Sequence, residues 1–234
     1  MPNERQPHQL TQSEINSITA DFIQAAKRVN SIDGIDGIEL HAAHGYLLHQ
    51  FLSPISNQRN DSYGGSLENR FRFVTEIFTG VRKVWKGVLG VRISATDWVE
   101  NGWDIESSIK LVKRLKELGL DYIHVSSGGI SPLQKISLGP NYQVPFAKMI
   151  KEQTGLTTIA VGLITDPHQA QEIINKNEAD GVALARAFLW NPRWGWQAAN
   201  TLKEKGVIES SSQYWRCLPR GANEIFADMK MGQR

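Results

Sequence analysis

The sequence predicts a parallel α/β fold, and three observations support this. Five short apolar segments alternate with longer segments whose apolar residues recur at helical spacing. Each short segment is continuously apolar, which is typical of strands buried on both faces. No linker or shift in composition divides the 234 residues, so we expect residues 1–234 to form a single domain. A doubly wound sheet and part of a (β/α)8 barrel both fit this pattern.

The first predicted element is a helix. Thr11 and Glu14 have the spacing of a capping box, and apolar residues follow at helical intervals as far as Asn30. A short apolar strand is expected next, over residues 38–40, and it ends at His41. The chain therefore begins with a helix that precedes the first strand.

Four further strand–helix units follow in the same rhythm. The remaining predicted strands are 88–93, 122–125, 158–161 and 181–185. The helices expected around them cover 67–85, 104–118, 144–154, a segment that starts at Pro167, and a segment after Pro192. Asp104 and Asp166 supply N-caps for two of these helices. We count five units, three fewer than a closed (β/α)8 barrel contains.

The composition excludes several classes of protein. Hydrophobic residues make up 41% of the chain and charged residues 21%, as in ordinary globular domains. The net charge of +2 gives no indication of binding to nucleic acid or to membranes. No apolar stretch approaches the ~20 residues of a membrane span, and the polar N-terminus has no signal-peptide core. The single cysteine, Cys217, cannot form an internal disulfide, so we expect a cytoplasmic protein.

The predicted strands end in small, basic or hydrogen-bonding residues. In parallel α/β folds the functional site lies at these strand ends and in the loops that follow them. The residues at the five strand ends are His41, Arg92, Ser126 to Gly129, Gly162, and Ala185 with Arg186.

Two histidines and a tyrosine follow the first strand, at His41, His44 and Tyr46. Two imidazoles here could bind a metal, act as acid and base, or donate hydrogen bonds to an oxyanion. We expect no metal, because a third ligand is missing and Glu39 is expected to point to the other side of the strand. Tyr46 could supply a proton. Purely structural roles for all three side chains remain open.

The last two strand ends suggest a phosphate site. Gly162 would let the backbone approach closely, and Arg186 would neutralise charge. The loops after the last two strands of barrels often bind phosphate. The alternative is that Arg186 only pairs with a carboxylate of the protein.

A known family matches these motifs. Residues 41–70 read HAAHGYLLHQFLSPISNQRNDSYGGSLENR. This stretch resembles the signature of the Old Yellow Enzyme family of flavin oxidoreductases. The His–His pair resembles the bacterial NADPH dehydrogenase, or thermophilic-like, branch. Further matches follow in order, at 90–92 (GVR), 125–128 (VSSG), 162–164 (GLI) and 185–187 (ARA), so the resemblance covers nearly the whole chain from Leu10.

The resemblance implies an FMN-binding (β/α)8 barrel that uses NAD(P)H to reduce activated alkenes such as α,β-unsaturated carbonyl compounds. On this basis His41 and His44 would bind the substrate carbonyl oxygen, where two fixed donors stabilise the enolate charge as it develops. Tyr46 would then protonate the α-carbon of the substrate.

The same resemblance assigns residues to the cofactor. Arg92 would lie at the pyrimidine edge of the flavin and favour its anionic reduced state. Ala185 and Arg186 would hold the phosphate, together with Gly162. Many family members have glycine at the position of Ala185, but only its backbone N–H is needed.

The resemblance also indicates what the chain lacks. The first three βα units of the family would precede Leu10, so we expect an incomplete barrel with open strand edges. Such edges invite pairing with another chain. Three explanations remain open: the chain is a fragment of a longer protein, which we favour, it is completed by a complementing N-terminal fragment, or it forms a homodimer. Residues 207–234 form a C-terminal tail. Within it, Arg216 resembles an arginine with which some family members reach into the active site of a neighbouring subunit. The alternative is that Arg216 is a solvated arginine of the tail.

Two other functions remain open beside the ene-reductase. The chain could be a catalytically inactive fragment or interaction module that keeps the scaffold but cannot retain FMN alone. It could also be a phosphate-binding isomerase or aldolase without a redox cofactor. That class would need a lysine or carboxylate at a strand end, and the sequence offers none in a convincing position.

Overall fold

The computed structural model describes residues 7–209, 211, 213, 214 and 225. In chain order the elements are α1 (Gln12–Asn30), β1 (Gly37–Ala42), α2 (Leu47–Leu52), α3 (Leu67–Val84), β2 (Val88–Ser94), α4 (Ile105–Glu117), β3 (Tyr122–Ser126), α5 (Val144–Thr154), β4 (Thr157–Val161), α6 (Pro167–Asn175), β5 (Gly181–Ala183), α7 (Arg186–Trp190) and α8 (Trp194–Thr201). None of the helices in this part of the chain combines the length and apolarity needed to cross a membrane.

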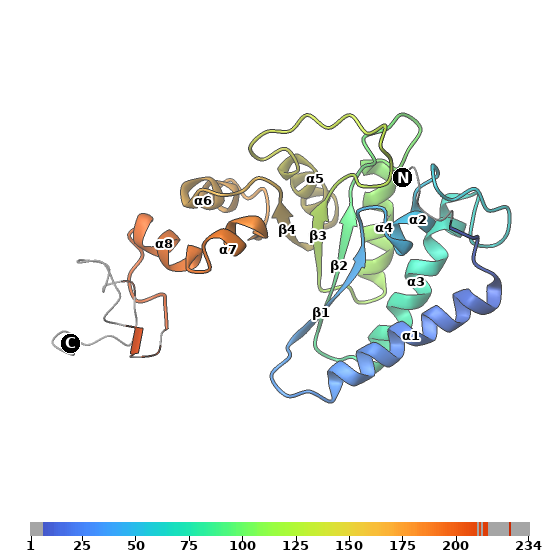
Figure 1. Cartoon of the computed structure of the whole chain (residues 1–234), viewed down its shortest axis with the longest axis horizontal. Helices are drawn as coiled ribbons and strands as arrows, with labels where there is room; N and C mark the ends of the chain where they lie inside the picture. Colours follow the sequence, from blue (N-terminus) through green and yellow to red (C-terminus); the bar gives the residue numbers. More distant parts are fainter. Residues whose placement is uncertain (1–6, 210, 212, 215–224, 226–234) are drawn as a thin grey trace.

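The five strands form one parallel sheet in the order β1-β2-β3-β4-β5. Each strand pairs with its successor in the sequence, whereas the strand order of a doubly wound sheet reverses at a switch point. The chain therefore forms part of a (β/α)8 barrel, with the five units predicted (Figure 1). Among the described residues, the outer edges of β1 and β5 pair with no further strand.

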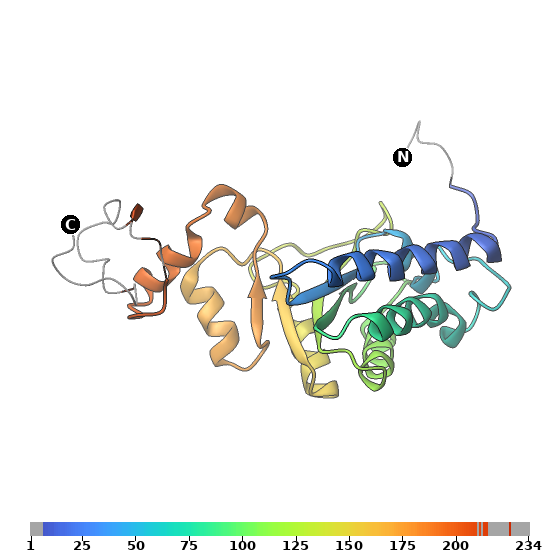
Figure 2. The same cartoon turned by 90° about the horizontal axis from the view of Figure 1, so that it is seen from below.

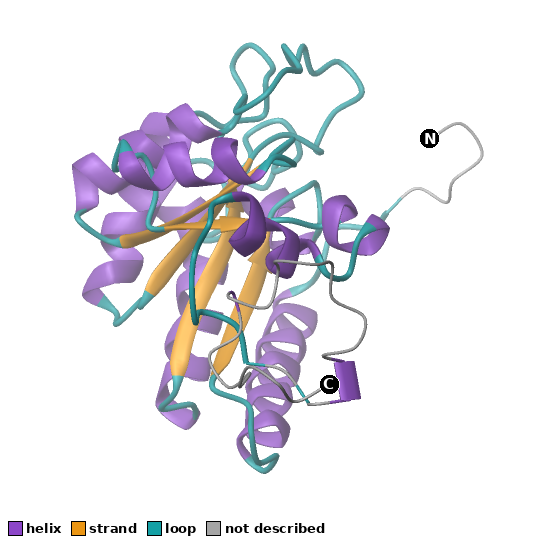
Figure 3. Ribbon diagram, turned by 90° about the vertical axis from the view of Figure 1, so that its left-hand side faces the viewer, coloured by secondary structure: helices purple, strands orange, loops and turns teal. Residues whose placement is uncertain are grey.

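The helices pack against one another and against the sheet to form the core. Helix α1 lies along α3, and α4 lies between α3 and α5. Helix α3 buries one apolar face, including Phe73, Ile77 and Phe78, in the same core as the strand residues Leu89 and Val91. Figure 3 shows the strands side by side with the helices around them. Helices α7 and α8 lie beyond β5, at the opposite end of the sheet from α1 (Figure 2).

The other face of the sheet carries polar side chains. Residues two apart in a strand share a face, and the in-register pairing aligns them across strands. His41 is opposite Arg92, and Arg92 is opposite His124. In β1, Glu39 and His41 are exposed while Leu40 is buried. The interior of the partial barrel is therefore polar and accessible beside β1.

The predicted elements all form, and two short helices were not predicted. Helix α2 has six residues and α7 has five, and neither has a side-chain cap. Such segments are too short to show helical periodicity and lack the usual start signal. The fifth strand is also shorter than predicted, because it ends at Ala183.

The loop between α2 and α3 is held by its own polar residues. The Asn57 side-chain amide is buried and donates to the carbonyl oxygens of Phe51 (2.6 Å) and Tyr63 (2.8 Å). Gly64 then passes so close to Arg59 that a Cβ atom at Gly64 would overlap the Arg59 carbonyl. A glycine is therefore required here for lack of space.

We predict that Gly64→Ala destabilises the protein by roughly 1–3 kcal/mol, because the new methyl group forces the Arg59 backbone to move. Urea denaturation would measure the change. Gly139→Ala is the matched control, since no atom lies within 4 Å of a Cβ atom there. Equal stability of the two variants would contradict the prediction.

Candidate active site

The residues after β1 form a compact aromatic cluster. The ring centroids of His41 and His44 are 5.3 Å apart, and those of His41 and Tyr46 are 5.4 Å apart. His41 ends the exposed face of β1, and Tyr46 is 64% exposed. The structure therefore brings together the three side chains predicted to act on the substrate, and the phenol of Tyr46 faces solvent.

A tight turn places His44 and Tyr46. His44 and Gly45 both have left-handed backbone conformations, with φ of 58° and 76°. A Cβ atom at Gly45 would overlap the Gly129 carbonyl, so only glycine lets the loops after β1 and β3 meet. The His44 N–H donates to Ser94 Oγ (3.0 Å), whose hydroxyl donates to the Gly128 carbonyl (2.8 Å). Three strand ends therefore fix this turn.

The side chain of His44 is hydrogen-bonded to the end of β3. Its Nε2 lies 2.7 Å from Ser126 Oγ, which in turn lies 3.3 Å from Gln143 Oε1. In the tautomer that carries the ring proton on Nε2, His44 donates to Ser126. A substrate oxygen could replace Ser126 as the acceptor of this N–H group.

Both imidazoles of the cluster are neutral near pH 7. Burial, and then the positive charge of Arg92, lower the pKa of His44 from 6.5 to about 4. The same two causes lower the pKa of His41. Two neutral N–H donors suit an oxygen that gains charge during a reaction, because they keep their protons as the charge develops.

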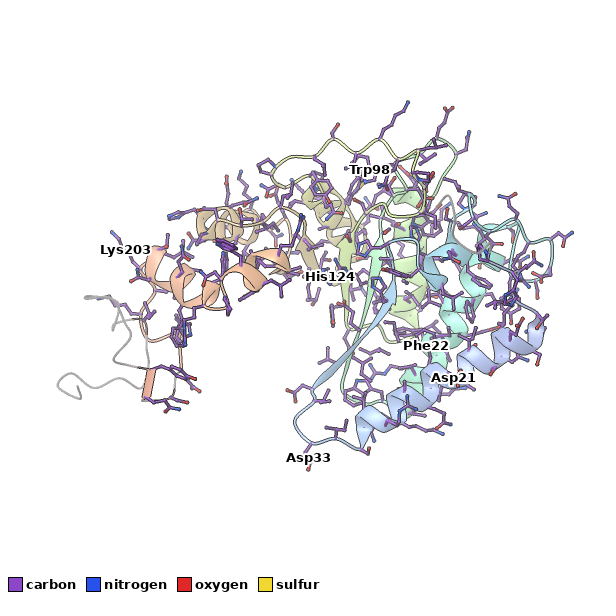
Figure 4. The ribbon with its side chains drawn as sticks, viewed as in Figure 1. Asp21, Phe22, Asp33, Trp98, His124 and Lys203 are labelled. Atoms are coloured by element: carbon purple, nitrogen blue, oxygen red, sulfur yellow. The ribbon has the colours of Figure 1, made fainter. Side chains whose placement is uncertain are left out.

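Arg92 lies beside this cluster on the polar face of the sheet. Its Nε–H is buried and has no partner among the described residues, and the same is true of His124 Nε2. Figure 4 labels His124 on β3. Buried polar atoms normally find a partner, so this face is suited to a ligand that offers hydrogen-bonding edges.

The expectation that Glu39 points away from His41 is wrong. Glu39 precedes His41 by two residues and so shares its face of β1. Its carboxylate accepts from His124 Nδ1 (3.1 Å). Burial raises the pKa of Glu39, but the hydrogen bond and charge of His124 outweigh it and the net pKa falls. Even so, the described residues contain no group of three His, Cys, Asp or Glu side chains suited to a metal ion.

The last two strand ends share one cavity of about 860 Å³. Its lining includes Gly162, Ala185 and Arg186, the three residues predicted to hold a phosphate. Gly162 has a φ of 113°, and a Cβ atom there would overlap the Gln143 amide. Arg92 does not line this cavity; it lies on β2, which pairs with β3.

The residues present fit FMN. Arg92 offers a buried and unpaired N–H group, and the cavity at Gly162 and Arg186 combines room for close backbone approach with a guanidinium group. An aromatic ring system with acceptor edges and a phosphate would match these two regions. Arg216, the predicted interface residue, lies outside the described residues, as does Cys217.

Three buried polar residues of the site were not predicted. Gln143 accepts from the Ser127 hydroxyl (2.6 Å) and donates to the Val161 carbonyl (2.8 Å), so it joins the loop after β3 to the end of β4. His49 and Asp97 are fully buried and pair at 2.9 Å. Asp97 lies only three residues after the end of β2, and this position just beyond a strand end could have marked it as a candidate site residue.

The comparisons with known proteins agree with this geometry. Residues 1–205 match the NADH:flavin oxidoreductase / NADH oxidase family. An NADPH dehydrogenase of Geobacillus thermodenitrificans is 47% identical over 211 residues, which make up 90% of this chain and 61% of that protein. One from Listeria innocua is 45% identical over 210 residues, again 90% and 61% of the two chains. The chain thus spans less than two thirds of the length of these relatives.

Two solved structures of reductases are also similar to this chain. A morphinone reductase in complex with tetrahydroNAD has a TM-score of 0.67 and 32% identity, over 82% of this chain and 52% of that chain. A 2-naphthoyl-CoA reductase has a TM-score of 0.75 and 26% identity, over 83% and 30% of the two chains.

We predict that His44 titrates with a pKa of about 4 in NMR spectra of its ring. Arg92→Met removes the nearby charge but keeps most of the side-chain volume, and it should raise this pKa towards 6.5. His168→Ala, an exposed change on α6, is the control and should leave the titration unchanged. A wild-type midpoint near 6.5 would contradict the prediction.

We also predict a loss of stability in acid that depends on His44. Between pH 6.5 and 4 the unfolded chain binds a proton at this residue that the folded chain does not, so the free energy of unfolding falls as the pH falls. Thermal unfolding of the wild type and of His44→Gln would show this as a smaller acid-induced decrease in the variant. Parallel decreases over this range would refute it.

Proposed function

The chain belongs to the NADH:flavin oxidoreductase / NADH oxidase family, and on that premise we propose that, within a complete barrel, it uses NAD(P)H and FMN to reduce activated alkenes. The observation that carries the proposal is the cluster of two neutral imidazoles and one exposed phenol at the end of β1. The family uses FMN and NAD(P)H. The names of the relatives favour NADPH, and a cytoplasmic location fits such a reductant.

His41 and His44 bind the carbonyl oxygen of an α,β-unsaturated substrate in this proposal. When bound, reduced FMN supplies hydride to the β-carbon. Negative charge then develops on the carbonyl oxygen, and the two N–H groups stabilise it more than they stabilise the neutral substrate. Because both rings are neutral, they stabilise the enolate without transferring a proton to its oxygen.

Tyr46 donates the proton to the α-carbon. Its hydroxyl group is accessible, and its ring lies beside His41 rather than in the core. A phenol is a weaker acid than an imidazolium, but a carbanion-like carbon is a strong enough base to take its proton.

Arg92, Gly162, Ala185 and Arg186 are the residues we propose to hold the cofactor. Arg92 would donate its buried Nε–H group to the flavin ring system, and its charge would favour an anionic ring. The other three line the cavity at the ends of β4 and β5, where a phosphate would meet the guanidinium of Arg186.

Activity in this proposal requires three further βα units, from the same or another polypeptide. The edges of β1 and β5 pair with no strand among the described residues, and the apolar residues Leu189 and Trp190 of α7 are 83% and 91% exposed. A homodimer, with Arg216 at its interface, is the other arrangement that the open edges allow. An inactive fragment that cannot retain FMN is the competing function.

A flavin titration separates these alternatives. The isolated chain should bind FMN weakly, and co-expression with the three N-terminal βα units of a relative should give a flavin-loaded complex that oxidises NADPH in the presence of 2-cyclohexenone. Stoichiometric FMN in the isolated chain would argue against the need for further units. A flavin-loaded complex without turnover would argue for the inactive module.

We predict that His41→Ala with His44→Ala lowers turnover of 2-cyclohexenone by about 10²–10³-fold in the complete, flavin-loaded barrel, because both oxyanion donors are lost. Tyr46→Phe should lower it by about 10²-fold or more. Steady-state NADPH oxidation measures both, and His168→Ala is the control. Unchanged turnover in the double variant would overturn the proposed roles of the histidines.

A further inference from the structure

A fully buried pair of residues lies beneath the turn that carries His44 and Tyr46. His49 of α2 and Asp97 of the loop after β2 both have 0% side-chain exposure, and His49 Nε2 lies 2.9 Å from Asp97 Oδ1. His49 also contacts the turn directly, because the Gly45 N–H donates to His49 Nδ1 at 2.9 Å. A continuous chain of hydrogen bonds therefore runs from Asp97 to the backbone of the turn.

These contacts fix the tautomer of His49. A backbone N–H can only donate, so His49 Nδ1 must be the unprotonated acceptor. The ring proton is then on Nε2 and is donated to Asp97 Oδ1. The other carboxylate oxygen, Oδ2, accepts from the Ser53 hydroxyl (2.6 Å) and from the Trp103 N–H (2.7 Å). Asp97 therefore takes three donors and leaves His49 one orientation.

We propose that Asp97 and His49 are positioning residues, which hold the Gly45 backbone and through it the donors of His44 and Tyr46. This inference rests on the proposed function of those two side chains. Gly45 stands between them in the chain, and both His44 and Gly45 have left-handed φ angles. Such a conformation is strained for a residue other than glycine, and it persists where neighbouring contacts determine it.

Asp97 acts on the turn by fixing which ring nitrogen of His49 carries the proton, and not by the volume of its side chain. Exchange of Asp97 for asparagine keeps the shape of the side chain. The backbone N–H of Trp103 can only donate. The amide oxygen of the new asparagine must therefore face Trp103, and its NH₂ group must face His49. His49 Nε2 would then have to accept, which moves the ring proton to Nδ1 against the Gly45 N–H. Asp97→Asn thus breaks a hydrogen bond that Asp97 itself does not make.

The test uses the complete, flavin-loaded protein and three readouts. We expect Asp97→Asn to speed hydrogen exchange of the Gly45 amide by about tenfold, and to move the His49 ring proton to Nδ1 in ¹⁵N spectra. The single-turnover rate of 2-cyclohexenone reduction should fall by about 10–100-fold at unchanged flavin content. His49→Ala should cause the same increase in Gly45 exchange and the same loss of rate. His49→Asn should restore much of the rate, because its amide oxygen can accept from Gly45 and its NH₂ group can donate to Asp97.

Ser108→Ala is the matched control. The Ser108 hydroxyl is also fully buried, accepts from Trp103 Nε1 (2.6 Å) and donates to the Ala95 carbonyl (2.9 Å), and within the described part of the chain it makes no hydrogen bond with Gly45. It should lower stability without changing Gly45 exchange or the single-turnover rate. Unchanged Gly45 exchange in Asp97→Asn would overturn the proposal, as would a rate loss no larger than that of Ser108→Ala. Absence of turnover in the wild type would instead overturn the proposed function, and Gly45 exchange would still decide this inference.

Discussion

The in-register parallel sheet is the constraint on which the site depends. Because all five strands run in one direction and pair in sequence order, their carboxyl ends meet at one edge. In Figure 1 the loops after β1, β2 and β3 gather beyond these ends. His41, Arg92 and His124 stand in one row across three strands for the same reason. A slip of one residue in any pair would turn these side chains into the apolar core.

Burial then sets the chemistry of the row. Burial, and then the charge of the half-buried Arg92, lower the pKa values of His41 and His44 and keep both rings neutral. The Glu39 carboxylate compensates part of that charge and pairs with His124. A donor pair that stays neutral across the physiological range is therefore a property of the packing, and neither histidine would have it in an exposed loop.

The sequence was sufficient for the fold and for the residues at the strand ends. Strand and helix periodicity, caps such as Thr11 and Asp166, and the polar residues that end each strand all carry local signals. The short helices α2 and α7 carry none, because they are too short to show helical periodicity and neither has a side-chain cap. The His49–Asp97 pair was missed because its partners lie 48 residues apart and each looks ordinary by itself. The face of Glu39 was a simpler error, since strand periodicity alone places it with His41.

Gln143 connects the loop after β3, which lies beside His44, to the end of β4, which lies beside the cavity at Gly162 and Arg186. Its amide touches the Ser127 hydroxyl on one side and the Val161 carbonyl on the other, and it fills the space next to Gly162. A substitution that moves this amide would therefore disturb the loop after β3 and the end of β4 together. Under the proposed function, substitutions that change the substrate range would have to keep this amide in place or change the affinity for the cofactor as well.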